Sequence, residues 1–219
     1  MNRILMGLLI LFLGISCTTE NETAKAIESI DLTVEVDRFD LKFYASKPNT
    51  LSALKQAYPY LFPVQNHDSI WINRINNSEE RELFQKAQKV FGDFSKQQTE
   101  LEDLFKHITY YHMGFKPPKI MTLISDLDYE SRVMYADSLL FISLDLFLGK
   151  KSEVYHDFPA YLSENFDPAV MTVAVAKTIV DDVFQFGRNR QFIAAMIQEG
   201  KKMYLLDLYL PNSSDSQKI

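Results

Sequence analysis

Alternating and helical hydrophobic patterns divide this chain into a strand-rich centre with helical segments around it. From Ile30 to Asp37 apolar and polar residues alternate strictly, which predicts a half-buried strand. The segments Ile120–Ser125 and Ser138–Phe147 carry apolar residues at both parities, which predicts strands that are covered on both faces. A hairpin between these two later strands is a plausible arrangement, with Asp126–Ala136 as an acidic, Tyr-containing connection.

Helical spacing of apolar residues recurs on both sides of this centre. Six helices are predicted: Thr50–Tyr58, Asp68–Ile75, Glu79–Phe91, Phe94–Tyr111, Ala169–Phe184 and Asn189–Tyr209. The last of them has an apolar stripe formed by Phe192, Met196, Met203 and Leu206. Residues Asn212–Ile219 are polar and are expected to be loose. The pattern predicts a single α+β domain over residues 30–219, with a small mixed sheet and several packed helices.

The N-terminus has the pattern of a bacterial lipoprotein signal. Met1–Ser16 combines an early Arg3 with an uncharged apolar run that is too short to span a bilayer comfortably. The run leads through Gly14-Ile15-Ser16 to Cys17, and that cysteine is the only one in the chain. We therefore expect residues 1–16 to be a signal peptide, Cys17 to be the lipid attachment site, and residues 17–29 to be a lipidated, flexible tether.

Composition narrows the classes of function. The chain has 219 residues with 47% hydrophobic residues, which favours a substantial core. A net charge of −6 without a basic cluster argues against nucleic-acid binding. One cysteine excludes an internal disulfide and a thiolate zinc site.

No complete catalytic or metal motif is present in the sequence. The pair His107 and His112 is five residues apart, which places the two rings on different helix faces, and H-E-x-x-H does not occur. Clustered glycines of the G-x-G-x-x-G, Walker and G-x-S-x-G types are also missing. We expect no metal and no cofactor.

Four carboxylates are candidates for a cleft. Asp126 and Asp128 follow a predicted strand, Asp145 interrupts an apolar run, and Glu199 lies on the last helix. A carboxylate within an apolar run needs a hydrogen-bond or charge partner, because burying it alone is costly. Such a group is more often structural than catalytic, and Glu199 is more often part of a solvated helix surface. For Asp145 an acid or base with a shifted pKa stays an open hypothesis, and Glu199 could face a cleft.

Several long sequence words resemble one known family. They are ISDLDY (124–129), LFISLDLFLGK (140–150), FPAYLSENFDP (158–168), MIQEGKKMYLLDLYLP (196–211) and, near the N-terminus, VEVDRFD (34–40). In this order and spacing they resemble the gliding motility lipoprotein GldB family of Bacteroidota, and Cys17 corresponds to the lipobox cysteine of that family.

The resemblance implies a membrane-anchored component of the gliding machinery, which is linked with type IX secretion. It also implies a degenerate zincin-like fold, in which Glu199-Gly200 keeps the shape of a third-ligand position although the helix over 169–184 has no histidine. Family members continue well beyond the position of Pro211, so either a short gene or a C-terminally truncated chain is expected.

The leading hypothesis is a non-enzymatic lipoprotein that is anchored in the cell envelope, faces the periplasm and contacts other gliding or secretion proteins. One alternative is an envelope hydrolase that uses Asp126, Asp128, Asp145 or Glu199. Another is a binding module for envelope ligands. The sequence does not choose between the inner and the outer membrane.

Overall fold

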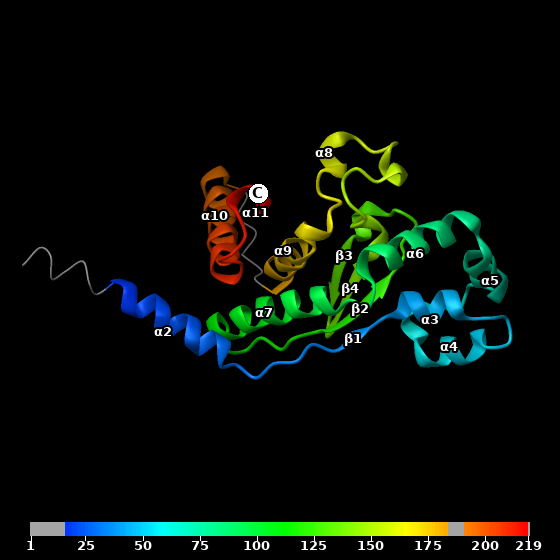
Figure 1. Ribbon diagram of the computed structural model, residues 1–219, viewed down its shortest axis with the longest axis horizontal. Coiled ribbons are helices and arrows are strands. Elements are labelled where there is room, and N and C mark those ends of the chain that lie inside the picture. Colours follow the sequence, from blue (N-terminus) through cyan, green and yellow to red (C-terminus); the bar gives the residue numbers. More distant parts are fainter. Residues whose placement is uncertain (1–15, 184–190, 219) are drawn as a thin grey trace, which may run out of the picture.

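The computed structural model describes residues 16–183 and 191–218, and Figure 1 shows their arrangement. Helices surround a small sheet, as the sequence predicted for an α+β domain. The α-helices are α2 (Ser16–Glu28), α3 (Phe39–Ala45), α4 (Leu51–Ala57), α5 (Asp68–Asn76), α6 (Ser78–Phe91), α7 (Ser95–Tyr111), α8 (Ala160–Ser163), α9 (Met171–Val183), α10 (Phe192–Tyr209) and α11 (Asp215–Lys218). Short 3-10 turns connect some of them: η1 (Pro59–Leu61), η2 (Tyr129–Ser131), η3 (Leu144–Leu146), η4 (Glu153–Tyr155) and η5 (Pro168–Val170).

The sheet is mixed and has the strand order β1-β2-β4-β3. Its strands are β1 (Val36–Asp37), β2 (Lys119–Leu123), β3 (Val133–Ala136) and β4 (Leu139–Ser143). β2 pairs in parallel with β1 and β4, whereas β3 pairs antiparallel with β4. Helix α3 packs against β2, and α9 packs against β3.

The predicted hairpin between the two later strands is wrong. Those strands are β2 and β4, and they pair in parallel, with Met121 beside Phe141. The hairpin partner of β4 is β3, which lies within the segment predicted to be a connection. Asp137 has a φ of 54° in the turn between β3 and β4. Since a positive φ is the geometry that a two-residue hairpin turn needs, the chain reverses there rather than between β2 and β4.

The first predicted strand is much shorter than its alternating pattern. Only Val36–Asp37 pairs with β2, although Val34 is buried and its neighbours Thr33 and Glu35 are exposed, as alternation requires. The backbone of Val34 bonds to side chains of α7 instead of a strand: its N–H donates to Glu102, and its carbonyl accepts from Gln98. Helix side chains therefore replace the missing strand partner.

The central helices follow the predicted stripes closely. Leu101, Leu104, Phe105 and Ile108 of α7 are all buried. On α9, Val173, Ala176 and Val180 are buried too. Asp167 accepts a hydrogen bond from the Ala169 N–H at 3.0 Å and caps the turn η5, which begins at Pro168 and leads into α9. The packing of α7 against α9 and α10 places the core between these helices and the sheet.

Both ends of the described chain are more ordered than the sequence suggested. The segment predicted to be a flexible tether forms α2, whose Ile27 is buried and which packs against α7. The polar C-terminal segment contains α11, where Lys218 is buried and pairs with Asp207 at 2.9 Å. Each end is held by tertiary contacts that its local sequence does not reveal. The predicted signal peptide falls almost entirely on residues 1–15, outside the described residues.

Candidate functional site

The Asp145 carboxylate organises the loop that follows β2. Asp145 has no exposed surface, and it accepts hydrogen bonds from the Ser125 N–H at 2.9 Å and the Leu127 N–H at 2.7 Å. The Ser125 hydroxyl donates to the same carboxylate. Burial raises the pKa of Asp145, while these donors act in the opposite direction by favouring the ionised form. The Asp145 carboxylate therefore holds the backbone of the loop after β2 in place.

This loop contains strained backbone. Asp126 and Leu127 have φ values of 62° and 60°, in the left-handed region that residues other than glycine rarely adopt. Such conformations cost free energy and persist where surrounding contacts impose them. The bond from the Leu127 N–H to Asp145 supplies one of these contacts.

The four predicted cleft residues do not form one cleft. Asp145 lies in η3 and bonds to the backbone on both sides of Asp126, but Asp126 is exposed and Asp145 is enclosed. Asp128 is exposed and accepts from the Glu130 N–H at 3.3 Å, so it caps the turn η2. Glu199 lines a different cavity, described below. The exposed stretch Asp126–Glu130, with its three carboxylates, is called the acidic loop below.

A cavity of about 200 Å³ lies beside the acidic loop, between α3, α5, η1 and the end of β2. Aromatic rings dominate its wall, and we call it the aromatic pocket. Its lining residues are Phe39, Asp40, Phe43, Tyr44, Leu61, Phe62, Trp71, Arg74, Leu123, Ile124, Ser125, Ser131 and Met134. The rings of Phe62 and Trp71 meet edge to face at 4.9 Å between centroids. Edge-to-face packing is a preferred arrangement of aromatic rings and adds about 0.5–1.5 kcal/mol per pair beyond the burial of their surface.

The charged groups in the wall of the aromatic pocket are paired. Arg74 donates to Glu80 through Nε and Nη2 at 2.9–3.1 Å, and the Tyr44 hydroxyl donates to Glu80 at 2.9 Å. Burial, followed by the charge of Glu80, raises the pKa of Tyr44, so its hydroxyl stays protonated and donates. Asp40 accepts from Arg38, Gln88 and Thr122. Both oxygens of the Asp40 and Glu80 carboxylates are therefore already engaged in hydrogen bonds within the domain.

Sequence reasoning missed the aromatic pocket. Its rings come from separate segments that meet only in the folded chain, and no regular spacing along the chain links them. One signal was available: Trp71 is the only tryptophan of the chain. Among the described residues, its indole Nε1 is one of two buried side-chain polar atoms without a hydrogen-bond partner. An unpaired buried N–H is costly, so this side chain is one to examine for function.

Glu199 lines a second cavity, of about 340 Å³, between α9, α10 and α11. Its walls also include Lys177, Val180, Asp181, Lys202, Met203, Leu206 and Lys218. Lys202 pairs with Asp181 at 2.7 Å and with Glu199 at 3.2 Å. Hydrogen bonding to Asp181 raises the pKa of Lys202 despite partial burial. Glu199 is thus a partner in a surface ion-pair group that links α9 and α10.

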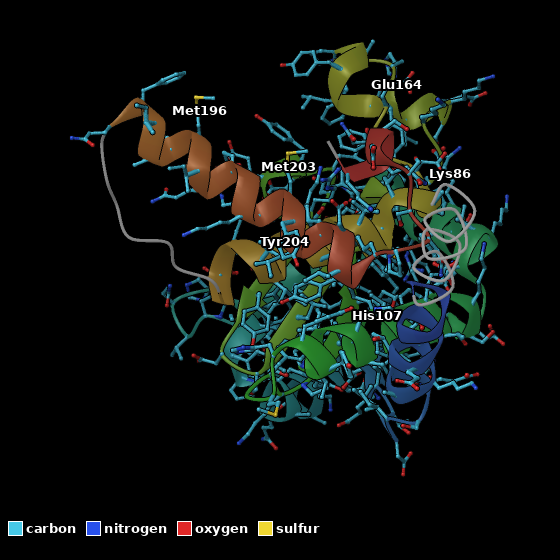
Figure 2. All side chains as sticks on the ribbon, turned by 90° about the vertical axis from the view of Figure 1, so that its left-hand side faces the viewer. Lys86, His107, Glu164, Met196, Met203 and Tyr204 are labelled. Atoms are coloured by element: carbon cyan, nitrogen blue, oxygen red, sulfur yellow. The ribbon has the colours of Figure 1, made fainter. Side chains whose placement is uncertain are left out.

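Helix α10 has an exposed apolar surface, and we call it the α10 outer face. Figure 2 shows Met196, Met203 and Tyr204 along this helix. The side chains of the face are 47–78% exposed: Phe192, Ile193, Met196, Ile197, Met203 and Tyr204. Of the apolar stripe predicted for this helix, only Leu206 is buried. The stripe is therefore mostly surface rather than core.

The opposite side of α10 is firmly attached to the domain. Leu206 and Tyr209 are buried, and α10 packs against α7 and α9. The His107 Nδ1–H of α7 donates to the Leu208 carbonyl at 3.0 Å. Since the inner side is fixed by these contacts, the outer face is presented in a defined orientation.

The described residues contain no group of three or more His, Cys, Asp or Glu side chains that could hold a metal ion. Glu199 therefore has no ligand partners there, and the zincin-like part of the resemblance gains no support. Within 16–183 and 191–218, no helix is long and apolar enough to cross a membrane. Cys17 lies in α2, but its side chain lies outside the described part of the chain.

Comparison with known families finds a match over most of the chain. The model of the family described as gliding motility protein GldB matches residues 20–219. Neither a curated protein nor a solved structure matches the chain. The match includes every described strand, the acidic loop and α10. The chain therefore belongs, over nearly its whole length, to the gliding motility protein GldB family.

Proposed function

We propose that this protein is a lipid-anchored component of the gliding motility machinery that acts by contacts with other proteins rather than by catalysis. Membership of the GldB family supports the place in gliding. The α10 outer face is the observation that carries the contact role. It sits on a helix whose other side is already packed into the domain.

An exposed apolar surface of this kind is costly to leave in water. Apolar area gains about 25 cal/mol per Å² on burial, and contiguous exposed patches are typical of interaction sites. The face contains two methionines and two large aromatic rings, Phe192 and Tyr204. Flexible methionines and aromatic rings are common at protein interfaces because they contribute much contact area. The occupant favoured by this argument is another protein of the same machinery.

The carboxylates support a non-enzymatic role. Asp145 holds a loop, Asp128 caps a turn, and Glu199 is paired with Lys202. An acid or base needs a free proton-transfer position within reach of a substrate. The envelope-hydrolase alternative therefore has Asp126 as the one candidate whose carboxylate has no hydrogen bond or ion pair in the described part of the chain.

The anchor in this proposal is an acyl chain on Cys17, which is the only cysteine and follows a lipobox-like sequence. An acylated cysteine would place the domain in the cell envelope, facing the periplasm, with its partners among the gliding and secretion proteins. A Cys17→Ser variant is expected to leave the membrane fraction and to stop spreading. A variant that stays in the membrane and spreads normally would remove the lipid anchor from the proposal.

The contact role is tested by a charge placed on the α10 outer face. Met196→Lys should abolish or strongly reduce surface spreading of a deletion strain, because a charge in a buried interface is costly. The matched control is Val64→Lys, at an exposed valine in the loop between η1 and α5. Both proteins must be present at the wild-type level. Equal spreading of the two strains would contradict the contact role.

A further inference from the structure

The aromatic pocket is a built cavity that the α10 contact does not use. We propose that it takes an aromatic side chain of a protein partner, flanked in the partner by lysine or arginine. This inference deepens the proposed contact function, because it adds a second contact site and states the chemistry of what fills it. It rests on the wall of the pocket and on the charge at its rim.

The size and wall of the pocket fit one ring. An apolar cavity of roughly 150 Å³ accepts benzene, and this one measures about 200 Å³. Phe39, Phe43 and Phe62 offer ring faces and edges, and the ring pairs among them are tilted or edge to face. Further ring edges can be added in the same geometry. A side chain such as Phe would be surrounded by aromatic and aliphatic groups.

The pocket can be reached from the surface. Met134, in its wall, is 38% exposed, and the Arg74 side chain is 35% exposed. Both lie at the border between the buried wall and solvent. An anchor side chain on a partner can therefore enter without unfolding the domain, and a central buried anchor is the usual source of binding energy in protein contacts.

The charge beside the pocket favours a partner that carries basic residues next to its aromatic side chain. Ser125 lines the pocket, and the acidic loop begins at the next residue. The carboxylates of Asp126, Asp128 and Glu130 are exposed there. Arg74 is the cation in the wall, but its charge is balanced by the buried Glu80. The acidic loop therefore adds negative charge beside the pocket, which attracts basic residues and repels acidic ones.

The single tryptophan gives a direct reading of occupancy. Because Trp71 is the only tryptophan and lies in the wall, its indole N–H gives one cross-peak in a nitrogen-proton correlation spectrum. The probe is the blocked peptide acetyl-Lys-Phe-Lys-amide, titrated into the chain from residue 18. We expect a saturable shift of the Trp71 cross-peak. Acetyl-Glu-Phe-Glu-amide should bind at least about tenfold more weakly, and acetyl-Lys-Ala-Lys-amide should give no saturable shift.

Two variants with equal charge changes locate the effect. The triple variant Asp126→Asn, Asp128→Asn and Glu130→Gln keeps an asparagine where φ is positive, and it should lower the affinity for the Lys-Phe-Lys peptide about fivefold. The control is Glu22→Gln, Glu28→Gln and Asp31→Asn, which removes three exposed carboxylates at and just after α2. Its affinity should equal that of wild type.

Several results would overturn the inference. They are no Trp71 shift with the Lys-Phe-Lys peptide, equal binding of the alanine peptide, equal binding of the glutamate peptide, or equal affinity of the two triple variants. The proposed gliding role is measured separately through spreading and Met196→Lys. Failure of the peptide titration would therefore overturn the pocket proposal without affecting the test of the gliding role, and the reverse also holds.

Discussion

Two regions of this molecule differ in which side chains they bury and which they expose. Figure 1 shows α3, α4 and α5 gathered at one end, with α2 and α10 toward the other. At the first end, carboxylates such as Asp40, Glu80 and Asp145 are buried and fully engaged. At the second end, apolar side chains of α10 are exposed in a row. Neither arrangement follows the simple rule of polar outside and apolar inside.

This contrast indicates which residues are candidates for a functional role. A buried carboxylate surrounded by N–H donors is already used for structure, however unusual its place in an apolar run. An exposed apolar side chain on a fixed helix has no such internal use. The α10 outer face and the aromatic pocket therefore carry more functional information than the acidic residues do.

The largest expected effect comes from Asp145→Ala. This change leaves the Ser125 and Leu127 N–H groups without acceptors, and an unsatisfied buried donor costs about 1–3 kcal/mol. We expect a loss of about 3 kcal/mol in the free energy of unfolding, measured by urea denaturation. Asp128→Ala, which removes an exposed cap in the same region, should cost less than about 1 kcal/mol. Similar losses for both variants would mean that Asp145 does not hold the loop.

Glu80→Gln should have the next largest effect. It removes the charge that Arg74 and Tyr44 bind, and losing one member of a buried pair is costly. Arg74 is partly exposed, so we expect a moderate loss of about 2 kcal/mol. The control Glu82→Gln removes an exposed partner of Lys86 and should change stability by less than about 0.5 kcal/mol. Thermal and urea unfolding of the two variants make the comparison.

Acid should lower the free energy of unfolding in part through protonation of Asp37. Burial acts to raise the pKa of Asp37, but hydrogen bonds from Lys42 and Tyr58 outweigh it and hold the pKa below 3.8. The folded state thus favours the ionised form. Its contribution is complete above the unfolded pKa near 3.8 and is lost as pH falls through the lower folded value.

The measurement for Asp37 is urea unfolding at pH 6 and at pH 3. Wild type should lose more stability between the two conditions than Asp37→Asn, which cannot lose this charge. An identical drop in both proteins would show that Asp37 takes no part in acid sensitivity.

The smallest effect is expected at the opposite end. Met196→Ser removes an exposed apolar side chain, so the free energy of unfolding should change by less than about 0.5 kcal/mol. Leu206→Ser, on the buried side of α10, should cost at least about 2 kcal/mol because it leaves a cavity and a buried hydroxyl. If Met196→Ser proved as damaging as Leu206→Ser, the outer face would have a structural use within the domain.

The sequence predicted the long helices well because their stripes are local. Leu101, Leu104 and Ile108 repeat at helical spacing, and burial of that face needs no knowledge of distant residues. The strand β3 could not be found in this way. Val133–Ala136 is short and only half covered, and it becomes a strand through pairing with β4.

The candidate sites were harder to predict because each depends on distant contacts. The donors to Asp145 lie 18 and 20 residues earlier in the chain, so the sequence showed an isolated carboxylate but not its partners. For α10 the stripe was visible, yet periodicity cannot say whether a stripe faces the core or solvent. The aromatic pocket combines rings from α3, from Phe62 just after η1 and from α5, and no local pattern joins them.

The helix α2 changes how the proposed lipid anchor would work. A helix rises about 1.5 Å per residue, so the 13 residues of α2 form a rod of about 20 Å. Cys17 lies at one end of this rod, and the buried Ile27 fixes the other end to the domain. A flexible linker would let the domain change its orientation freely at the bilayer. With the proposed anchor, a rod attached to α7 would instead set the distance between the domain and the bilayer and limit which sides of the domain a neighbouring protein can meet.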